Sequence, residues 1–269
     1  MKEFSKRDAL IALAIRHRGD VTAIMGAIRK REGLEYEEIE SLLGTNHSKA
    51  ITVFDPEYPE TLLRIHPSPV VLFYRGDITL IRNANDNVAI VGARECHTYA
   101  MDKTTEIAGQ LAKRGMGIVS GLATGIDTCA LQAAYPYGRA IAVIGSGMDY
   151  YYPSDNRRLQ QHIAEYGLSL SEYPDDVEPS PRNFVARNRI IAGLASLTIV
   201  AEAKLKSGSL ITACFAASIN HDVGAFPHDD NGDDGCNEII KDGAFLISSI
   251  NDVQVILGTR GEKFFLPKK

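Results

Sequence analysis

Glycines and hydroxyl-bearing residues follow several short apolar runs of this sequence. The segment 118–127, IVSGLATGID, is the clearest case, since two β-branched residues lead directly into a turn with two glycines, a serine and a threonine. Such turns expose backbone amides and hydroxyls, which bind phosphate well where a helix begins. They also serve turn geometry and helix capping, but their recurrence after four runs favours one shared anion site. The candidate residues in these turns are Gly92, Arg94, Ser120, Gly121, Thr124, Gly147, Lys206, Ser207, Gly208 and Ser209.

Arginine side chains are concentrated in the segment 182–194, RNFVARNRIIAGL. Its candidate residues are Arg187, Asn188 and Arg189. The planar arginine fork donates two hydrogen bonds at once, which suits phosphate. On a helix the last two arginines point about 200° apart, so one can reach an anion site while the other packs or pairs elsewhere. An ion pair with Glu172 or Glu202 is the alternative for either of them.

Short apolar runs recur from Val88 onward, and segments of helical length separate most of them. The runs span residues 88–92, 117–121, 140–145, 168–172, 197–203, 223–226 and 244–247. Strands that alternate with helices indicate a mostly parallel sheet covered on both faces. We therefore predict a fold of the α/β class, an extended Rossmann-like doubly wound sheet. Ligands of such folds bind outside the carboxyl ends of the strands, where the candidate residues lie.

The chain divides into four predicted parts. Helical patterns without strand signals occupy the N-terminus, and an irregular stretch with four prolines and one short apolar run follows. The predicted parts are a small helical domain at 1–48, a connecting segment packed on the core at 49–87, the Rossmann-like core at 88–258, and a C-terminal tail at 259–269.

Composition limits the class of protein. The chain has 269 residues and a net charge of −5. Proteins that coat duplex DNA are usually basic, so we expect no broad DNA-binding face, although screening allows a local basic pocket. No apolar run reaches the roughly 18 residues of a membrane span. The four cysteines are far apart and form no CxxC pair, so we expect no zinc, no disulfide and a cytoplasmic location.

Two motifs for other ligands are incomplete. The segment 145–150, GSGMDY, lacks the third glycine of a dinucleotide fingerprint, and the sequence has no P-loop. The acidic segment 228–237 has calcium-loop spacing in part, but Asp234 replaces the required glycine and Ile240 replaces the bidentate glutamate. We therefore expect no cofactor, no metal and a mobile solvated loop at 228–235.

Seven segments occur in an order that resembles one known family. They are VAIVGARE, IVSGLATGID, AVIGSGMDYYYPSDN, SEYP, FVARNRIIAGL, VAEA followed by SGSLITA, and GCNEIIKDGA. Together they resemble the DNA-processing protein A (DprA/Smf) family over roughly residues 50–250. By the same resemblance, we expect the helical domain at 1–48 to be SAM-like and the tail at 259–269 to contain no winged-helix domain. The resemblance implies a non-catalytic homodimer that binds single-stranded DNA. Such a protein protects incoming DNA in natural transformation and helps to load the RecA recombinase onto it.

The family's Gly-Ser-Arg motif falls on Gly92, Ala93 and Arg94, with alanine in place of the serine. The resemblance makes Arg94 the main expected phosphate contact. It also implies that the glycines of SGLATGID let backbone amides approach the DNA backbone, with two hydroxyls as further donors.

The family's Tyr-Pro-x-x-Asn motif falls on residues 152–156 and adds Asn156 to the expected site. Many members carry a basic residue directly after this proline, where Ser154 stands here. Arg157 and Arg158 could compensate, and a solvated helix face is the alternative for both.

One further departure removes expected positive charge. Asn220 and His221 stand where many members have Gly-Arg. Together with the acidic loop, this predicts a modest affinity that weakens quickly with salt. The tyrosines 150–152 and Phe184 are candidates for stacking on bases, with packing as their alternative.

Two other functions are compatible with the sequence. The first is a nucleoside-monophosphate N-glycosidase (phosphoribohydrolase-like) on a related fold, with Glu172 or Glu202 as acid or nucleophile and Arg94 or Arg187 holding the phosphate. The loop of the Pro-Gly-Gly-x-Gly-Thr type that such enzymes use is missing. The second is an interaction scaffold in which the dimer face matters and the crevice does not.

Overall fold

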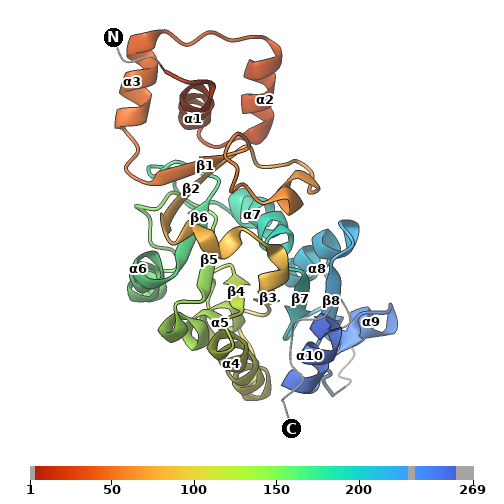
Figure 1. Cartoon of the computed structure of the whole chain (residues 1–269). Coiled ribbons are helices and arrows are strands. Elements are labelled where there is room, and N and C mark those ends of the chain that lie inside the picture. The colour runs from red at the N-terminus through yellow and green to blue at the C-terminus, as the bar shows by residue number, and fades with distance from the viewer. Residues whose placement is uncertain (1–3, 230–233, 259–269) are drawn as a thin grey trace.

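One nine-stranded sheet runs through the part of the chain that the structure describes (Figure 1). The computed structural model describes residues 4–229 and 234–258. The sheet order is β1-β2-β6-β5-β4-β3-β7-β8-β9. The strands are β1 (Lys49–Thr52), β2 (Val71–Gly76), β3 (Asn87–Val91), β4 (Gly117–Ser120), β5 (Ala140–Ile144), β6 (Leu168–Ser171), β7 (Leu197–Val200), β8 (Asp222–Ala225) and β9 (Phe245–Leu246).

The strand order reverses next to β3. The chain moves outward from β3 through β4, β5 and β6, and then returns to place β7, β8 and β9 on the other side of β3. All pairings from β6 to β9 are parallel, whereas β1 with β2 and β2 with β6 are antiparallel. This topology confirms the predicted α/β doubly wound sheet. The carboxyl ends of β3 and β7 flank the switch point, which is where open α/β sheets bind ligands.

Helices cover both faces of the sheet. Val88 and Ile90 of β3 pack in one apolar cluster with α4, α5, α6 and α10, whereas Ala89 and Val91 pack in another with η1, α7, α8 and α9. This two-residue alternation explains the apolar runs, because a strand buried on both faces needs apolar residues at every position.

Within the described ranges, no helix has both the length and the apolar character needed to cross a bilayer. The helices are α1 (Lys6–Arg16), α2 (Val21–Arg29), α3 (Tyr36–Gly44), α4 (Thr98–Lys113), α5 (Ile126–Ala134), α6 (Arg157–Tyr166), α7 (Pro181–Gly193), α8 (Gly208–Ser218), α9 (Gly235–Lys241) and α10 (Ile250–Gly258), with the 3-10 turns η1 (Glu60–Leu63), η2 (Ile78–Ile81), η3 (Ala84–Asp86), η4 (Tyr135–Tyr137) and η5 (Ser154–Asn156).

Helices α1 to α3 form the expected small N-terminal helical unit, which lies beside β1 and β2 at the top of Figure 1. Ser5 begins α1 with a capping box, in which Asp8 N donates to Ser5 Oγ and Ser5 N donates to the Asp8 carboxylate. The apolar side chains of α1 and α2 pack on Phe73 of β2. The buried carboxylate of Asp175 accepts a hydrogen bond from Ser48 N at 2.8 Å and so ties this unit to the core.

The connecting segment 49–87 is more regular than the sequence predicts. It contributes two strands, β1 and β2, and β2 pairs with β6 in a register that places Phe73 opposite Ser171. Only the apolar run at 70–74 signalled a strand. The four residues of β1 show no apolar–polar alternation, and pairing with a strand distant in sequence decides their conformation.

Candidate functional site

A pocket of about 490 Å³ opens beside the switch point, where β3 ends and α8 begins. We call it the carboxyl-edge pocket, and its other lining residues include Asp127, Tyr152 and Phe184. The topology therefore brings together residues from five separate sequence segments. The predicted site residues that line it are Gly92, Arg94, Arg187, Asn188, Ser207, Gly208 and Ser209.

Arg94 is exposed and lies on a fixed main chain. Ala93 N donates to Glu202 O at 2.8 Å, and Ile126 N donates to Ala93 O at 3.2 Å. Arg94 Cζ lies 6.0 Å from the centroid of the Phe184 ring, within the range of a cation–π contact. In the described part of the chain, its guanidinium makes no hydrogen bond or ion pair. All five N–H donors of this side chain are thus available to an anion.

Two aromatic rings continue the surface below Arg94. Phe184 on α7 stacks on Tyr152, with ring centroids 5.0 Å apart and an interplanar angle of 21°. Tyr152 is 47% exposed, so one face of this pair is open to solvent. Aromatic faces of this kind stack on nucleic-acid bases with little regard to sequence.

Arg187 lies beneath the pocket. It is 6% exposed, and Nη1 donates to the main-chain oxygens of Gly121 and Val143 at the ends of β4 and β5. A Cβ on Gly121 would collide with the guanidinium of Arg187 and with the carboxylate of Asp127, which explains the glycine. Burial lowers the pKa of Arg187 and raises the pKa of Asp127, and the charge of each opposes the shift of the other. Because arginine stays protonated in proteins, Arg187 places a fixed positive charge under the pocket.

Helix α8 begins at the pocket with Ser207 as its N-cap. Ser207 Oγ is buried and has no hydrogen-bond partner within the described residues. Asn188 Nδ2 donates to Gly208 O at 3.1 Å and holds the start of α8 against α7. The first amides of a helix carry the positive end of its dipole. An anion is the group that these amides, the Ser207 hydroxyl and Arg94 can bind together.

Arg189 does not reach the pocket, which corrects its expected role. Its Nη2 donates to both carboxylate oxygens of Glu172, at 2.6 and 2.8 Å, and its Nε donates to Pro67 O at 2.8 Å. Arg189 is 2% exposed, and burial raises the pKa of Glu172 although the charge of Arg189 opposes this. Arg187 and Arg189 of α7 thus diverge as their spacing predicts, and the ion-pair alternative holds for Arg189.

Three further predicted residues support the strand ends from inside. Ser120 is buried and its hydroxyl donates to Ile90 O at 2.6 Å. Asn156 Nδ2 donates to Leu122 O at 3.0 Å and so fixes the turn after β4. Gly147 N donates to a main-chain oxygen at 2.7 Å. These groups satisfy buried polar atoms, so the structure gives them no free donor for a phosphate.

Four more predicted residues lie outside the lining of the pocket. Arg157 and Arg158 are exposed at the start of α6, and Arg157 Cζ lies 4.8 Å from the ring centroid of Tyr151. Lys206 is exposed in the turn before α8, with a φ of 65°. Thr124 is half-buried beside Gly121 in the turn after β4.

Sequence reasoning missed Asp127 and Thr212 as lining residues of the carboxyl-edge pocket. A signal was available for Asp127, because it closes the GLATGID motif and falls in the first turn of α5. Thr212 lies one helical turn beyond Gly208 on α8, and its apolar neighbours gave no sign of a site.

The expected mobile loop at 228–235 and the expected tail at 259–269 lie partly or wholly outside the described residues. The structure does not describe residues 230–233 or 259–269. Across residues 4–229 and 234–258, no group of three histidine, cysteine, aspartate or glutamate side chains is arranged to hold a metal.

The fold and the pocket define a Rossmann-like α/β protein with an arginine-lined pocket at its switch point. A family model, the DNA recombination-mediator protein A family, matches residues 49–258. The chain belongs to this family, as the motif resemblance indicated.

Named relatives show the same kinship. The chain is 45% identical over 207 residues to DNA processing protein DprA of Streptococcus pneumoniae, covering 76% of this chain and 72% of that protein. It is 38% identical over 252 residues to Protein Smf of Synechocystis, covering 86% of this chain and 63% of that protein.

Two solved structures are similar over most of their length. The X-ray structure of DprA from Streptococcus pneumoniae has a TM-score of 0.79 and 33% identity, covering 95% of this chain and 98% of that one. DprA from Helicobacter pylori, in a structure described for its single-stranded DNA binding mode, has a TM-score of 0.71 and 34% identity, covering 80% and 96%.

Proposed function

We propose that this protein binds single-stranded DNA in the carboxyl-edge pocket. The observation that carries the proposal is the exposed Arg94, whose guanidinium has no partner in the described chain and lies over Phe184. The relative from Helicobacter pylori, with 34% identity, supports the choice of single-stranded DNA as the ligand.

The geometry suggests separate roles for the backbone and the bases of DNA. A phosphate would lie between Arg94 and the first turn of α8, where Ser207 Oγ has no partner among the described residues. A base would stack on the open face of the Tyr152–Phe184 pair. Single strands fit this arrangement better than duplexes, because the bases of a duplex are already stacked on one another.

We propose further that binding serves recombination and not catalysis. In this proposal the protein protects incoming DNA in natural transformation and helps to load RecA in the cytoplasm, as its family membership suggests. A homodimer is part of the same proposal. The edge strand β9 supports it, because Phe245 is 46% and Leu246 is 51% exposed there and no further strand of the described chain pairs beyond β9. We also propose that the chain has four parts, at residues 1–48, 49–87, 88–258 and 259–269.

The N-glycosidase alternative has less support, because the two glutamates that it needs, Glu172 and Glu202, have other partners. Glu172 is 5% exposed and paired with Arg189. Glu202 accepts hydrogen bonds from His97 N at 2.8 Å and pairs with His97 Nδ1 at 2.9 Å. Neither lines the carboxyl-edge pocket, whose lining includes one carboxylate, Asp127.

Titration of a fluorescent oligothymidylate tests the proposal. We expect Arg94→Ala to weaken binding at least about tenfold, or about 1.4 kcal/mol, and to reduce the salt dependence by roughly 0.7 in the slope of log K against log salt. Arg29→Ala is the matched control, since Arg29 is an exposed arginine on α2.

Three results would contradict this function. They are equal effects of the two substitutions, equal affinity for a duplex of the same length, and release of free base from AMP or CMP above background.

A further inference from the structure

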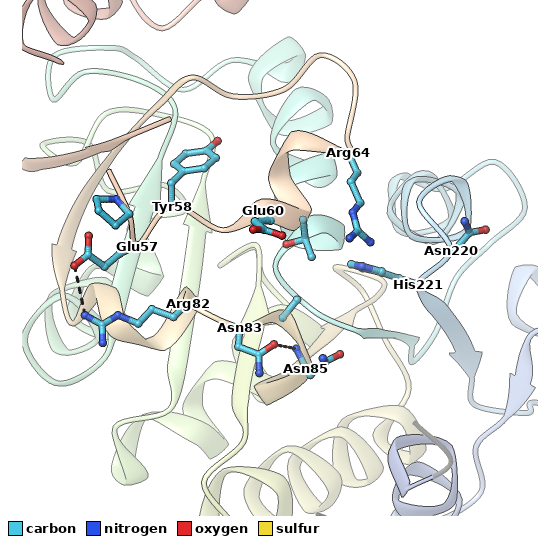
Figure 2. A pocket seen from close by; sticks show the side chains of 12 residues that line it. Glu57, Tyr58, Glu60, Arg64, Arg82, Asn83, Asn85, Asn220 and His221 are labelled. Atoms are coloured by element: carbon cyan, nitrogen blue, oxygen red, sulfur yellow. Dashed lines mark hydrogen bonds and ion pairs between the residues drawn. The ribbon is translucent and has the colours of Figure 1, made fainter. Parts of the chain in front are cut away.

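A second and larger cavity, of about 790 Å³, lies at the opposite edge of the sheet (Figure 2). Three segments form it: η1 with the loop before it, the stretch joining η2 to η3, and the turn between α8 and β8. We call it the amino-edge pocket, because β3 and β8 begin beside it. It shares no lining residue with the carboxyl-edge pocket. The residues that matter below are Glu57, Glu60, Thr61, Arg64, Arg82 and His221.

One side of the amino-edge pocket is cationic. Arg64 is exposed and, within the residues that the structure describes, makes no side-chain hydrogen bond or ion pair. Figure 2 shows its guanidinium pointing from the end of η1 toward the imidazole of His221. That ring is oriented by the main chain, since His221 Nδ1 lies 3.1 Å from Ala192 O. The planar fork of Arg64 is a suitable receptor for a phosphate group.

The amino-edge pocket also contains two carboxylates, and one of them is not neutralised by an arginine of the described chain. Arg82 and Glu57 neutralise each other at 3.8 Å. Glu60 is exposed, and its carboxylate has no partner among the described residues. In the view of Figure 2 it lies between the Arg64 side and the Arg82–Glu57 side. Thr61 Oγ1 is buried at the same wall without a partner in the described chain.

These features narrow the class of ligand. A simple anion would use Arg64 but would be repelled by Glu60. A ligand that carries a phosphate at one end and N–H donors at the other satisfies both groups. Nucleotides have this character, because adenine, cytosine and guanine present exocyclic amino donors and carboxylates accept from them. Side chains of three asparagines, Asn83, Asn85 and Asn220, add donors and acceptors to the wall. The cavity volume lies within the range of small-molecule sites.

We propose that the amino-edge pocket is a nucleotide-binding site, with the phosphate on Arg64 and the amino edge of the base on Glu60. The site is separate from the carboxyl-edge pocket and does not depend on the function proposed for that pocket. The same chemistry fits a free nucleotide and the terminal nucleotide of a DNA strand.

Isothermal titration with the four deoxynucleoside monophosphates tests this assignment. The full chain carrying Arg94→Ala is the starting protein, so that the carboxyl-edge pocket contributes little. We expect adding Arg64→Ala to weaken all four ligands about tenfold, and adding Arg29→Ala to leave them unchanged. Both side chains are exposed, so neither change threatens folding. Glu60→Gln should weaken dAMP, dCMP and dGMP roughly threefold relative to dTMP, whose base has no amino group.

Each other outcome overturns the assignment. No binding of any nucleotide to the Arg94→Ala protein would remove the site. Equal effects of Arg64→Ala and Arg29→Ala would show that charge alone matters, and binding of inorganic phosphate as tight as that of nucleotides would show an anion site only.

A 5′-phosphorylated oligonucleotide distinguishes the two sources of nucleotide. Tighter binding of this strand than of the same strand with a 5′-hydroxyl end assigns the site to DNA ends, and equal binding of the two strands assigns it to free nucleotides. The oligothymidylate titration uses a strand without a 5′-phosphate and measures the effect of Arg94→Ala, so failure of the function proposed for the carboxyl-edge pocket can be told from failure of this assignment.

Discussion

The two pockets of this protein lie at opposite edges of one sheet, and they hold their cations differently. At the carboxyl edge, Arg187 is 6% exposed and donates to main-chain oxygens of two strand ends. At the amino edge, Arg64 stands exposed on a connecting segment. Preorganised charge lowers the cost of ordering a side chain on binding. The contrast teaches that a buried arginine held by strand ends supplies a rigid charge, whereas an exposed arginine supplies an adaptable one.

The largest expected effect is a loss of stability when the buried arginine, Arg187, is replaced. Arg187→Ala removes the donors to Gly121 O and Val143 O and leaves Asp127 without its compensating charge. We expect the free energy of unfolding to fall by about 3–5 kcal/mol, measured by urea denaturation. Arg64→Ala, the exposed counterpart, should change it by less than about 0.5 kcal/mol. Equal losses in the two variants would show that the burial of Arg187 has no structural role.

The aromatic residues of the two pockets also differ, and a substitution there should have a smaller effect, on DNA affinity. Tyr58 in the amino-edge pocket is 7% exposed, so it offers no open face, whereas the Phe184–Tyr152 pair does. Phe184→Ala should weaken oligothymidylate binding by about 1–3 kcal/mol in a fluorescence titration. Phe54→Ala is the control, because Phe54 is 58% exposed on the connecting segment. Unchanged affinity in Phe184→Ala would mean that bases do not stack there.

The smallest expected effect concerns pH. Burial raises the pKa of Asp127 in the folded protein, although Arg187 opposes the shift. A raised folded-state pKa means that protonation of this carboxyl stabilises the fold at low pH, and that this stabilisation is lost as pH rises through the folded-state pKa.

Asp127→Asn carries no titrating proton at this position. The stability of the unmutated protein relative to this variant should therefore increase as pH falls from 7 to 5. Urea denaturation at the two pH values measures the difference. A relative stability that decreases toward pH 5 would reverse the sign and contradict the burial argument.

Much of the fold could be predicted because it rests on local pattern. The apolar runs that begin near Val88 predicted β3 to β9 within a few residues. Strands β3 to β7 are buried along their whole length, and such strands need continuous apolar sequence. Strand β1 could not be predicted, because its four residues depend on pairing with β2 and, through β2, with the sheet.

The candidate site was predictable in part. Residues at strand ends, such as Gly92 and Arg94, could be placed at one edge from topology alone. Ser120 and Asn156 could not be told from ligand-binding residues, because the same polar groups also satisfy buried main-chain atoms. Which role a hydroxyl or amide takes depends on partners that are distant in sequence.

The sequence by itself determined the α/β class, the doubly wound order and the clustering of small and cationic residues at the strand ends, because period and turn chemistry are local properties of the chain. The tertiary structure decided which arginine of α7 lies under the pocket and which is sealed by Glu172, which aromatic pair is open, and where the amino-edge pocket forms. These outcomes depend on side-chain burial and on contacts between segments more than a hundred residues apart, which no local pattern specifies.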